Sequence, residues 1–103
     1  MNLEERVQIA ILTKYYGAML TDRQRDILSM YVDSNLSLAE VSAELGISRQ
    51  AVKDALDNSL SSLKHMEEKL HFISRDDNIK KLIEENKDID EKTKNKLIAL
   101  LED

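Results

Sequence analysis

The chain has 103 residues, no cysteine or proline, two glycines and a formal net charge of −5. This length allows one domain with a modest core and argues against a large active-site cleft, while the lack of cysteine excludes disulfides and thiolate chemistry. With 42% apolar and 34% charged residues the chain is globular in composition, and the scarcity of proline and glycine favours an all-α fold with long helices.

No apolar run approaches the roughly 20 residues that a membrane-spanning helix needs. The first residues, Met1 to Arg6, lack the basic flank and apolar centre of an export signal. We therefore expect a cytoplasmic protein without membrane insertion. No segment of the chain is net basic, which argues against a strong grip on nucleic-acid phosphates.

The first predicted helix runs from Leu3 to Tyr16, with Asn2 as its cap and Glu5 at the capping-box position. Its apolar residues cover more than the single stripe of an ordinary surface helix. They are Leu3, Val7, Ile9, Ala10, Ile11, Leu12, Tyr15 and Tyr16. A second surface must cover this helix, either the C-terminal helices or a second copy of the chain in a homodimer.

A second helix is predicted over residues 22–34. Gly17 ends the first helix, and Thr21 with Gln24 forms a capping box that begins the next. Its apolar face consists of Ile27, Leu28, Tyr31 and Val32. This helix is placed to support the motif that follows it.

The stretch Leu36 to Val52 has the pattern of a helix-turn-helix. Ser37 and Glu40 form a capping box that begins a short helix, and Gly46 ends it, because glycine alone adopts positive φ without a steric cost. Ser48 then caps the second helix. Apolar residues lie at the spacings that bury the inner faces of both helices: Ala39, Val41, Leu45, Ile47 and Val52.

In DNA-binding proteins with this motif, the first exposed residues of the second helix read base edges in the major groove. The candidate nucleic-acid-binding residues are Ser48, Arg49, Gln50, Lys53 and Asp57. Asp54 and Asp57 would repel phosphates, although a carboxylate can accept a hydrogen bond from the amino group of cytosine. The alternative is a helical corner that serves packing or protein contact only.

The helical pattern continues past the motif, so the second helix is predicted to extend for about 25 residues, to Ile73. Its apolar seam has a period close to 3.5, and an ordinary core stripe is favoured over a coiled coil because fewer than four heptads are present. The seam consists of Val52, Leu56, Leu60, Leu63, Met66, Leu70 and Ile73.

Two further helices are predicted in the remaining chain. Ser74 to Asp77 breaks the pattern and supplies caps for one helix, and Lys87 to Asp90 breaks it again before the last. We expect a helix-turn-helix domain over residues 1–73 and a C-terminal helical pair over residues 74–103 that packs on the same domain. The mixed charges of this tail are typical of a solvated amphipathic pair, and an interaction arm is the alternative.

The sequence shows no constellation of residues for catalysis. His65 and His71 do not share a helical face, and no third metal ligand lies nearby. Gly17 and Gly46 are the only glycines, so there is no glycine-rich phosphate loop, and no nucleophile has a recognisable base beside it. We therefore predict a non-enzymatic protein that has no metal and no cofactor.

The residues Thr21 to Leu28, followed by Leu36 to Val52, resemble the fourth conserved region of bacterial sigma factors, a helix-turn-helix that binds the promoter minus-35 element. This resemblance covers roughly Leu20 to Leu63. It implies a sigma region 4 type fold, in the winged-helix-like superfamily but without a wing, with a long extended recognition helix. The function that it implies is that of a transcriptional regulator reading duplex DNA.

A second resemblance covers the entire chain. The residues 3–21, 26–32 and 64–70 look like those of the YlxM family of small helix-turn-helix proteins from Gram-positive bacteria. Members of that family are associated with the signal recognition particle pathway. The resemblance therefore implies a regulatory protein that binds the RNA of this particle, its GTPase or both, and it implies no catalytic residue.

Overall fold

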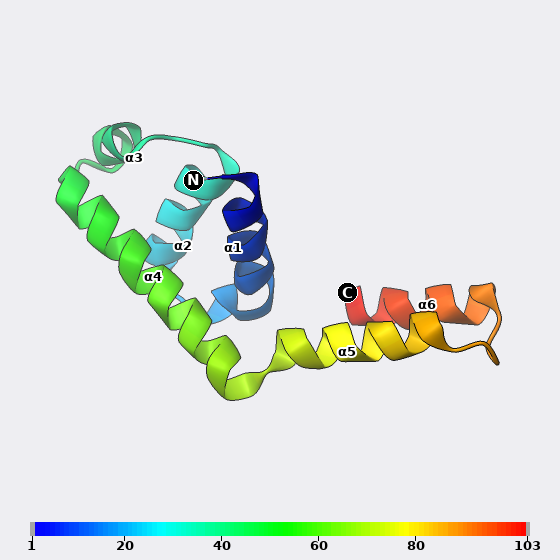
Figure 1. Cartoon of the computed structure of the whole chain (residues 1–103). Coiled ribbons are helices and arrows are strands. Elements are labelled where there is room, and N and C mark those ends of the chain that lie inside the picture. The colour runs from blue at the N-terminus through cyan, green and yellow to red at the C-terminus, as the bar shows by residue number, and fades with distance from the viewer. Residues whose placement is uncertain (1, 103) are drawn as a thin grey trace. The chain divides into compact units, whose positions relative to one another are not determined.

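The computed structural model describes residues 2–102, and all regular secondary structure in this range is helical, as the sequence predicts (Figure 1). These residues form two compact units that divide between Leu70 and His71. The first unit contains α1 (Leu3–Tyr16), the 3-10 turn η1 (Gly17–Met19), α2 (Asp22–Leu28), the π-helical turn η2 (Ser29–Asp33), α3 (Leu38–Leu45) and α4 (Arg49–Leu70). The second contains α5 (Phe72–Glu85) and α6 (Glu91–Glu102).

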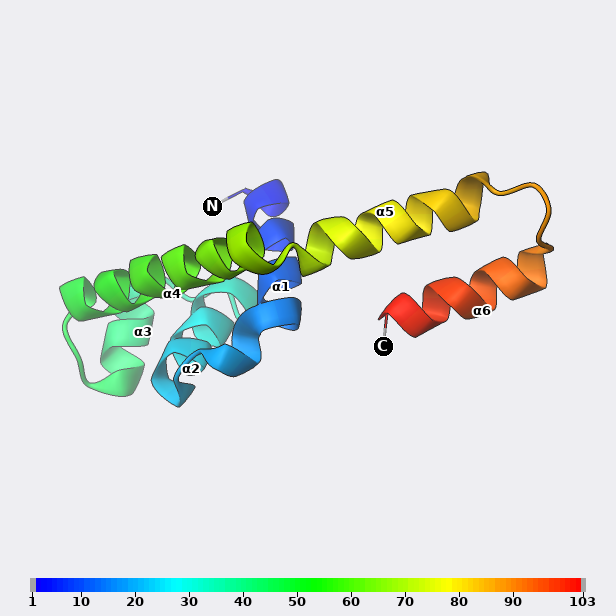
Figure 2. The ribbon, with the colours of Figure 1, turned by 90° about the horizontal axis from the view of Figure 1, so that it is seen from below.

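The long helix α4 is the element against which the other helices of the first unit pack. It contacts α1, α2 and α3, and it runs beside all three in Figure 2. The inner face of α4 and the three helices around it supply the core, whose fully buried side chains are Tyr16, Ile27, Val41, Val52, Ser59 and Leu63. The predicted apolar seam is therefore the core stripe of α4 over its first four turns, as expected.

Local caps begin the helices of the first unit where the sequence predicts them. Asn2 Oδ1 accepts a hydrogen bond from the Glu5 backbone N–H at 2.8 Å. The capping boxes of Thr21 with Gln24 and of Ser37 with Glu40 are both closed in each direction. Each cap satisfies amide groups that have no partner in the first turn, so these boundaries depend only on residues three positions apart.

The predicted helix over residues 22–34 is present but not regular. After Leu28 it widens into η2, where the Ser34 N–H donates to the Ser29 carbonyl at 3.0 Å. The guanidinium of Arg6 on α1 donates to the Val32 carbonyl and to Asn35 Oδ1, the latter at 3.2 Å. Since carbonyls at a helix end lack partners within the helix, Arg6 satisfies one of them and holds the loop that leads to α3.

Gly17 acts differently from the expected glycine cap. The helix α1 ends at Tyr16 as predicted, but Gly17 has φ −60° and the chain continues in the right-handed sense into η1. A Cβ at this position would lie 2.9 Å from Thr13 Cγ2. Close approach, and not a left-handed turn, therefore explains the glycine.

The predicted end of the long helix is wrong. The helix α4 ends at Leu70, before the predicted Ile73, because His71 adopts the left-handed conformation with φ 58°. The helix α5 begins directly after His71, so Ser74 to Asp77 lies inside a helix instead of capping one. The Ser74 hydroxyl donates to the His71 carbonyl at 3.1 Å, which satisfies a group at the break. Histidine adopts this conformation more readily than most residues, but no glycine or proline marks the position.

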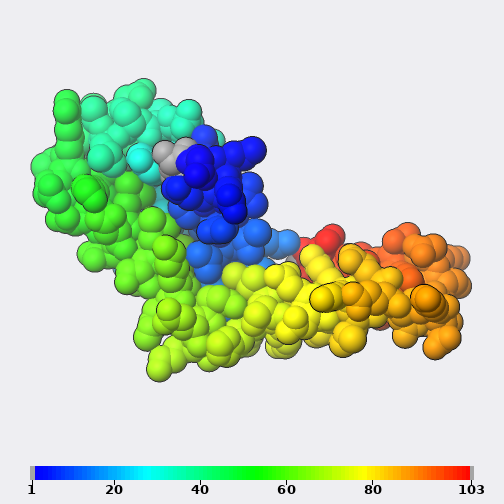
Figure 3. Space-filling model, viewed as in Figure 1, coloured from blue at the N-terminus to red at the C-terminus, as the bar shows by residue number. Residues whose placement is uncertain are grey.

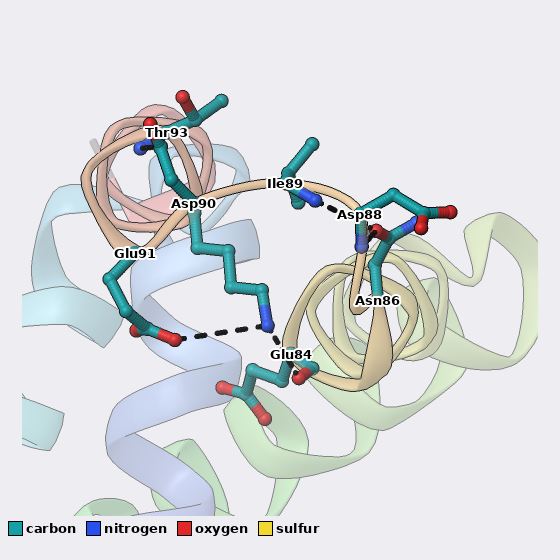
Figure 4. Close-up of polar contacts among 8 residues, drawn as sticks. Glu84, Asn86, Asp88, Ile89, Asp90, Glu91 and Thr93 are labelled. Carbon is teal, nitrogen blue, oxygen red and sulfur yellow. Dashed lines mark hydrogen bonds and ion pairs between the residues drawn. The ribbon is translucent and has the colours of Figure 1, made fainter.

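In the second unit, α5 and α6 pack against each other, which confirms the predicted helical pair. Asn86 Oδ1 accepts two backbone hydrogen bonds from the connecting loop, at 2.7 and 3.2 Å, and Asp90 Oδ1 accepts one from the Thr93 N–H at 2.7 Å (Figure 4). The Lys94 ammonium donates to the Glu84 carbonyl at 3.2 Å and joins the two helices. That this pair packs on the helix-turn-helix domain stays a prediction.

Candidate nucleic-acid interface

The corner between α3 and α4 has the geometry that the sequence predicts. Gly46 adopts φ 67° and ψ 32°, and its N–H donates to the Ser42 carbonyl at 2.9 Å. No atom lies within 4 Å of a Cβ built on Gly46, so backbone conformation alone requires glycine here. The Ser42 hydroxyl donates to the Ile47 carbonyl across the turn, and the corner is thereby hydrogen-bonded on both sides of Gly46.

Ser48 caps the second helix of the motif and is not free to read a base with its hydroxyl. Its Oγ accepts a hydrogen bond from the Ala51 N–H at 3.0 Å. Arg49, Gln50, Lys53 and Asp57 follow on the exposed side of the first turns of α4. Helical spacing places these four residues on one side of α4, and the structure thus brings together the residues that the sequence selects.

Two of the four candidates are engaged with carboxylates on the same helix. The Lys53 ammonium lies 2.9 Å from Asp57 Oδ2, and Gln50 Nε2 donates to Asp54 Oδ1 at 2.8 Å. The hydrogen bond to Asp57 and the charge of Asp57 raise the pKa of Lys53 above its ordinary value, and the charge of Asp54 acts in the same direction. Lys53 therefore stays protonated at neutral pH, with an anion beside it.

Arg49 differs from Lys53 and Gln50. Its exposed side chain makes no hydrogen bond or ion pair with another residue in the described part of the chain. A guanidinium presents a planar fork of donors that matches two acceptors on guanine or two phosphate oxygens. Among the candidate residues, Arg49 is thus the cation whose side chain has no acceptor within the described residues.

The exposed first turns of α4 carry balanced charge. Arg49 and Lys53 are offset by Asp54 and Asp57, and Glu44 on α3 is also exposed nearby in the motif. Counterion release scales with the number of phosphates that a surface neutralises. This face therefore has no excess of positive charge with which to hold phosphates.

A groove of about 460 Å³ lies between α1, the end of α2 with η2, the first residue of α3 and the middle of α4. Its walls are mainly apolar, and Lys53 and Asp57 also line it, so this ion pair belongs both to the candidate interface and to the groove. The apolar lining consists of Ile9, Leu12, Leu28, Val32, Leu38, Leu56 and Leu60. The groove could not be predicted from the sequence, because its walls come from helices whose relative positions the apolar pattern does not give.

The corner, its two capped helices and the exposed start of α4 define a helix-turn-helix protein. The family match agrees, because residues 3–102 match the UPF0122 family, which is described as "Putative helix-turn-helix protein, YlxM / p13 like". The chain belongs to this family, and its predicted resemblance to the YlxM family is confirmed.

Similar proteins from several bacteria support the assignment. A UPF0122 protein of Clostridium kluyveri is 42% identical over 85 residues, which cover 82% of this chain and 73% of that protein. A UPF0122 protein of Caldanaerobacter subterraneus subsp. tengcongensis is 44% identical over 80 residues, covering 78% of this chain and 68% of that protein. A Mycoplasma mycoides protein named as a probable UPF0122 protein is 37% identical over 92 residues, covering 87% and 81%.

Within residues 2–102, no helix combines the length and the apolar character that crossing a bilayer requires.

Proposed function

We propose that this protein is a non-enzymatic regulatory protein that contacts nucleic acid through Arg49 and the first turns of α4. We further propose that it acts in the cytoplasm in the signal recognition particle pathway, on the particle's RNA, its GTPase or both. The observation that carries the nucleic-acid part is the helix-turn-helix corner that presents an exposed Arg49 without an intramolecular partner. The pathway is suggested by the resemblance to the YlxM family.

The charge of the face favours RNA over duplex DNA as the ligand. A balanced surface gains little from phosphates, which supply most of the affinity of DNA-binding proteins. RNA is recognised largely through shape, 2′-hydroxyl groups and unpaired bases, which a neutral polar face can contact. Gln50, Lys53 and Asp57 offer donors and acceptors of this kind beside Arg49.

A second candidate function is that of a transcriptional regulator that reads duplex DNA. The geometry of the corner favours it, because a helix that follows such a turn places its N-terminal residues against base edges in the major groove. In this case Arg49 would donate two hydrogen bonds to a guanine, while the Lys53–Asp57 pair would lie toward the backbone or a cytosine.

One binding experiment separates these functions. The affinity of the full chain is measured across a salt series for the particle's purified RNA, its purified GTPase and a pool of genomic duplex fragments. For duplex DNA, the logarithm of the binding constant should fall against the logarithm of the salt concentration with a slope of about 0.9 per phosphate neutralised. For single-stranded RNA the slope should be about 0.7 per phosphate. The Arg49→Ala variant should lose about 1 to 3 kcal/mol of nucleic-acid affinity if Arg49 contacts a base in bidentate fashion.

Lys81→Ala serves as the matched control, because Lys81 is an exposed cation of α5, in the other unit. It removes one positive charge and should leave nucleic-acid affinity nearly unchanged. If the full chain binds neither the particle's RNA nor its GTPase, the proposed role in the pathway is wrong. If no nucleic acid binds and Arg49→Glu changes nothing, the motif serves protein packing only and the nucleic-acid proposal fails.

A further inference from the structure

The outer side of α1 carries an exposed apolar stripe. Leu3 is 77% exposed, Val7 49% and Ile11 41%, and they recur at every fourth position with Ala10 exposed beside them. We call Leu3, Val7, Ala10 and Ile11 the outer stripe. The opposite side of the same helix holds Ile9, which is buried with the core, so α1 is apolar on two sides.

The outer stripe is unusual among the exposed helical surfaces of the first unit. Single exposed apolar residues are normal, but a row of three large aliphatic side chains on one helical face marks an interaction surface. By contrast, the exposed side of α4 begins with charged and polar residues. Figure 3 shows α1, in dark blue, lying open on one face of the first unit. A helix that is apolar on both sides needs a second packing partner.

We infer that this partner is a second copy of the chain, which pairs through α1 in the antiparallel direction about a twofold axis. The charges of α1 support this choice. Its first turn carries Glu4 and Glu5, and its last turn carries Lys14, an exposed cation that also has an interaction within its own chain. Antiparallel pairing brings the acidic end of each helix to the basic end of the other, whereas parallel pairing would bring like charges together. A twofold contact requires such a self-complementary surface.

The charges also select a register. If Glu4 is level with Lys14 of the second copy, then Val7 is level with Ile11 of that copy, because both pairs are centred on the same point of the helix. Each pair thus occurs twice, once on either side of the twofold axis. The Val7–Ile11 pairs lie at the centre of the contact, and the ion pairs lie at its ends. Ala10 lies at the edge of the outer stripe, and its small side chain allows the two helix axes to approach.

The inference is tested first by the subunit count. Sedimentation equilibrium of the wild-type chain should give a dimer that dissociates on dilution. The double variant Val7→Glu with Ile11→Glu should raise the dissociation constant by roughly 30-fold or more, because buried anchors of an interface each carry about 2 kcal/mol or more. Since both side chains are exposed in the single chain, circular dichroism should show unchanged helicity.

The control uses two apolar side chains of the other unit that are more exposed than Val7 and Ile11. Leu82 and Leu100 are 71% and 72% exposed, and the double variant Leu82→Glu with Leu100→Glu should keep the dimer. Loss of the dimer in this control but not in the α1 variant would assign the interface to the second unit and overturn the inference. A wild-type chain that stays monomeric up to millimolar concentration would also overturn it.

The direction of pairing is tested by cross-linking, for which a chain without cysteine is well suited. A mixture of Val7→Cys and Ile11→Cys chains should form a disulfide-linked mixed dimer faster than either variant alone. Preferential linking of Val7→Cys chains to one another would indicate parallel helices. In addition, Glu4→Lys should weaken the dimer and Glu4→Lys with Lys14→Glu should restore it, since the double exchange keeps opposite charges level. Failure of the double exchange to restore it would contradict the antiparallel register.

Discussion

The hydroxyl of Tyr16 donates a hydrogen bond to Oε1 of Glu67 at 2.5 Å, although 51 residues separate the two in the chain. Tyr16 ends α1 and is fully buried, while Glu67 lies in the far half of α4 and is half-buried. The bond therefore fixes the end of α1 against the part of α4 that lies farthest from the helix-turn-helix corner.

Tyr16→Phe is expected to lower the free energy of unfolding by about 1.5 to 3 kcal/mol, the usual range for a hydrogen bond to a charged group. Urea denaturation followed by circular dichroism measures it. Tyr31→Phe is the matched control, because the hydroxyl of the half-buried Tyr31 makes no hydrogen bond to another residue within 2–102. Equal losses in the two variants would show that the bond to Glu67 adds nothing.

Gly46→Ala is expected to destabilise the first unit by about 1 kcal/mol, because any side chain at φ 67° meets the penalty of the left-handed region. Gly46→Asn should cost less, since asparagine tolerates this conformation. Space is not the cause, because nothing lies within 4 Å of the added Cβ. The midpoint of urea denaturation should therefore rank glycine above asparagine and asparagine above alanine, and an unchanged midpoint for alanine would disprove the strain.

Asp57→Asn is expected to strengthen nucleic-acid binding several-fold. The change releases Lys53 from its ion pair and removes one charge that repels phosphates. It should also steepen the salt dependence of binding to duplex DNA. The slope of log affinity against log salt concentration should rise by up to about 0.9 if one further phosphate is neutralised. The pKa of Lys53 should fall toward its ordinary value, because Asp57 is the main cause of its rise. Titration by NMR measures the pKa, and the salt series measures the slope.

Asp77→Asn provides the control for this experiment, since Asp77 is an exposed carboxylate of α5. Both variants change the net charge equally, but only Asp57→Asn frees a cation on α4. An equal gain in both would attribute the effect to net charge and contradict a specific role for the Lys53–Asp57 pair.

Acid should loosen the start of α6. The hydrogen bonds from the Thr93 side chain and backbone lower the pKa of Asp90 below its ordinary value. A carboxyl whose pKa is lower in the folded state stabilises that state when the pH is above the pKa of the unfolded state, near 3.8. This stabilisation is lost as the pH falls through the lower pKa of the folded state. Asp90→Asn keeps a cap that does not titrate, so its helicity should change less than that of the wild type between about pH 5 and 2.

Hydrogen exchange of the amides of α6 over this pH range measures the effect. The Thr93 N–H is the amide to follow, because Asp90 Oδ1 accepts its hydrogen bond. Equal acid sensitivity of Asp90→Asn and the wild type would mean that another carboxyl causes the loosening of α6 in acid.

The candidate site could be read from the sequence to the extent that it depends on neighbours along the chain. Gly46, Ser48 and the capping box of Ser37 act within four residues, and their geometry follows from the residue types alone. The partners of Lys53 and Gln50 were not predicted, although both lie four positions along α4. The signal was present in the spacing of opposite or complementary side chains, which form such pairs on a helix.

By itself, the sequence determined an all-helical chain, the starts of the helices in the first unit and the glycine corner of the motif, because caps, propensities and positive φ are local properties. Only the structure decided that the long helix ends at Leu70, before the left-handed His71, that the helix before the motif widens into η2, and that Arg6 closes that widened end. It also decided which side of α1 meets the core and which side keeps Val7 and Ile11 exposed. The closure of the widened end and the burial of one side of α1 depend on contacts between helices far apart in the chain. An apolar pattern gives the faces of a helix but not the neighbour that each face meets.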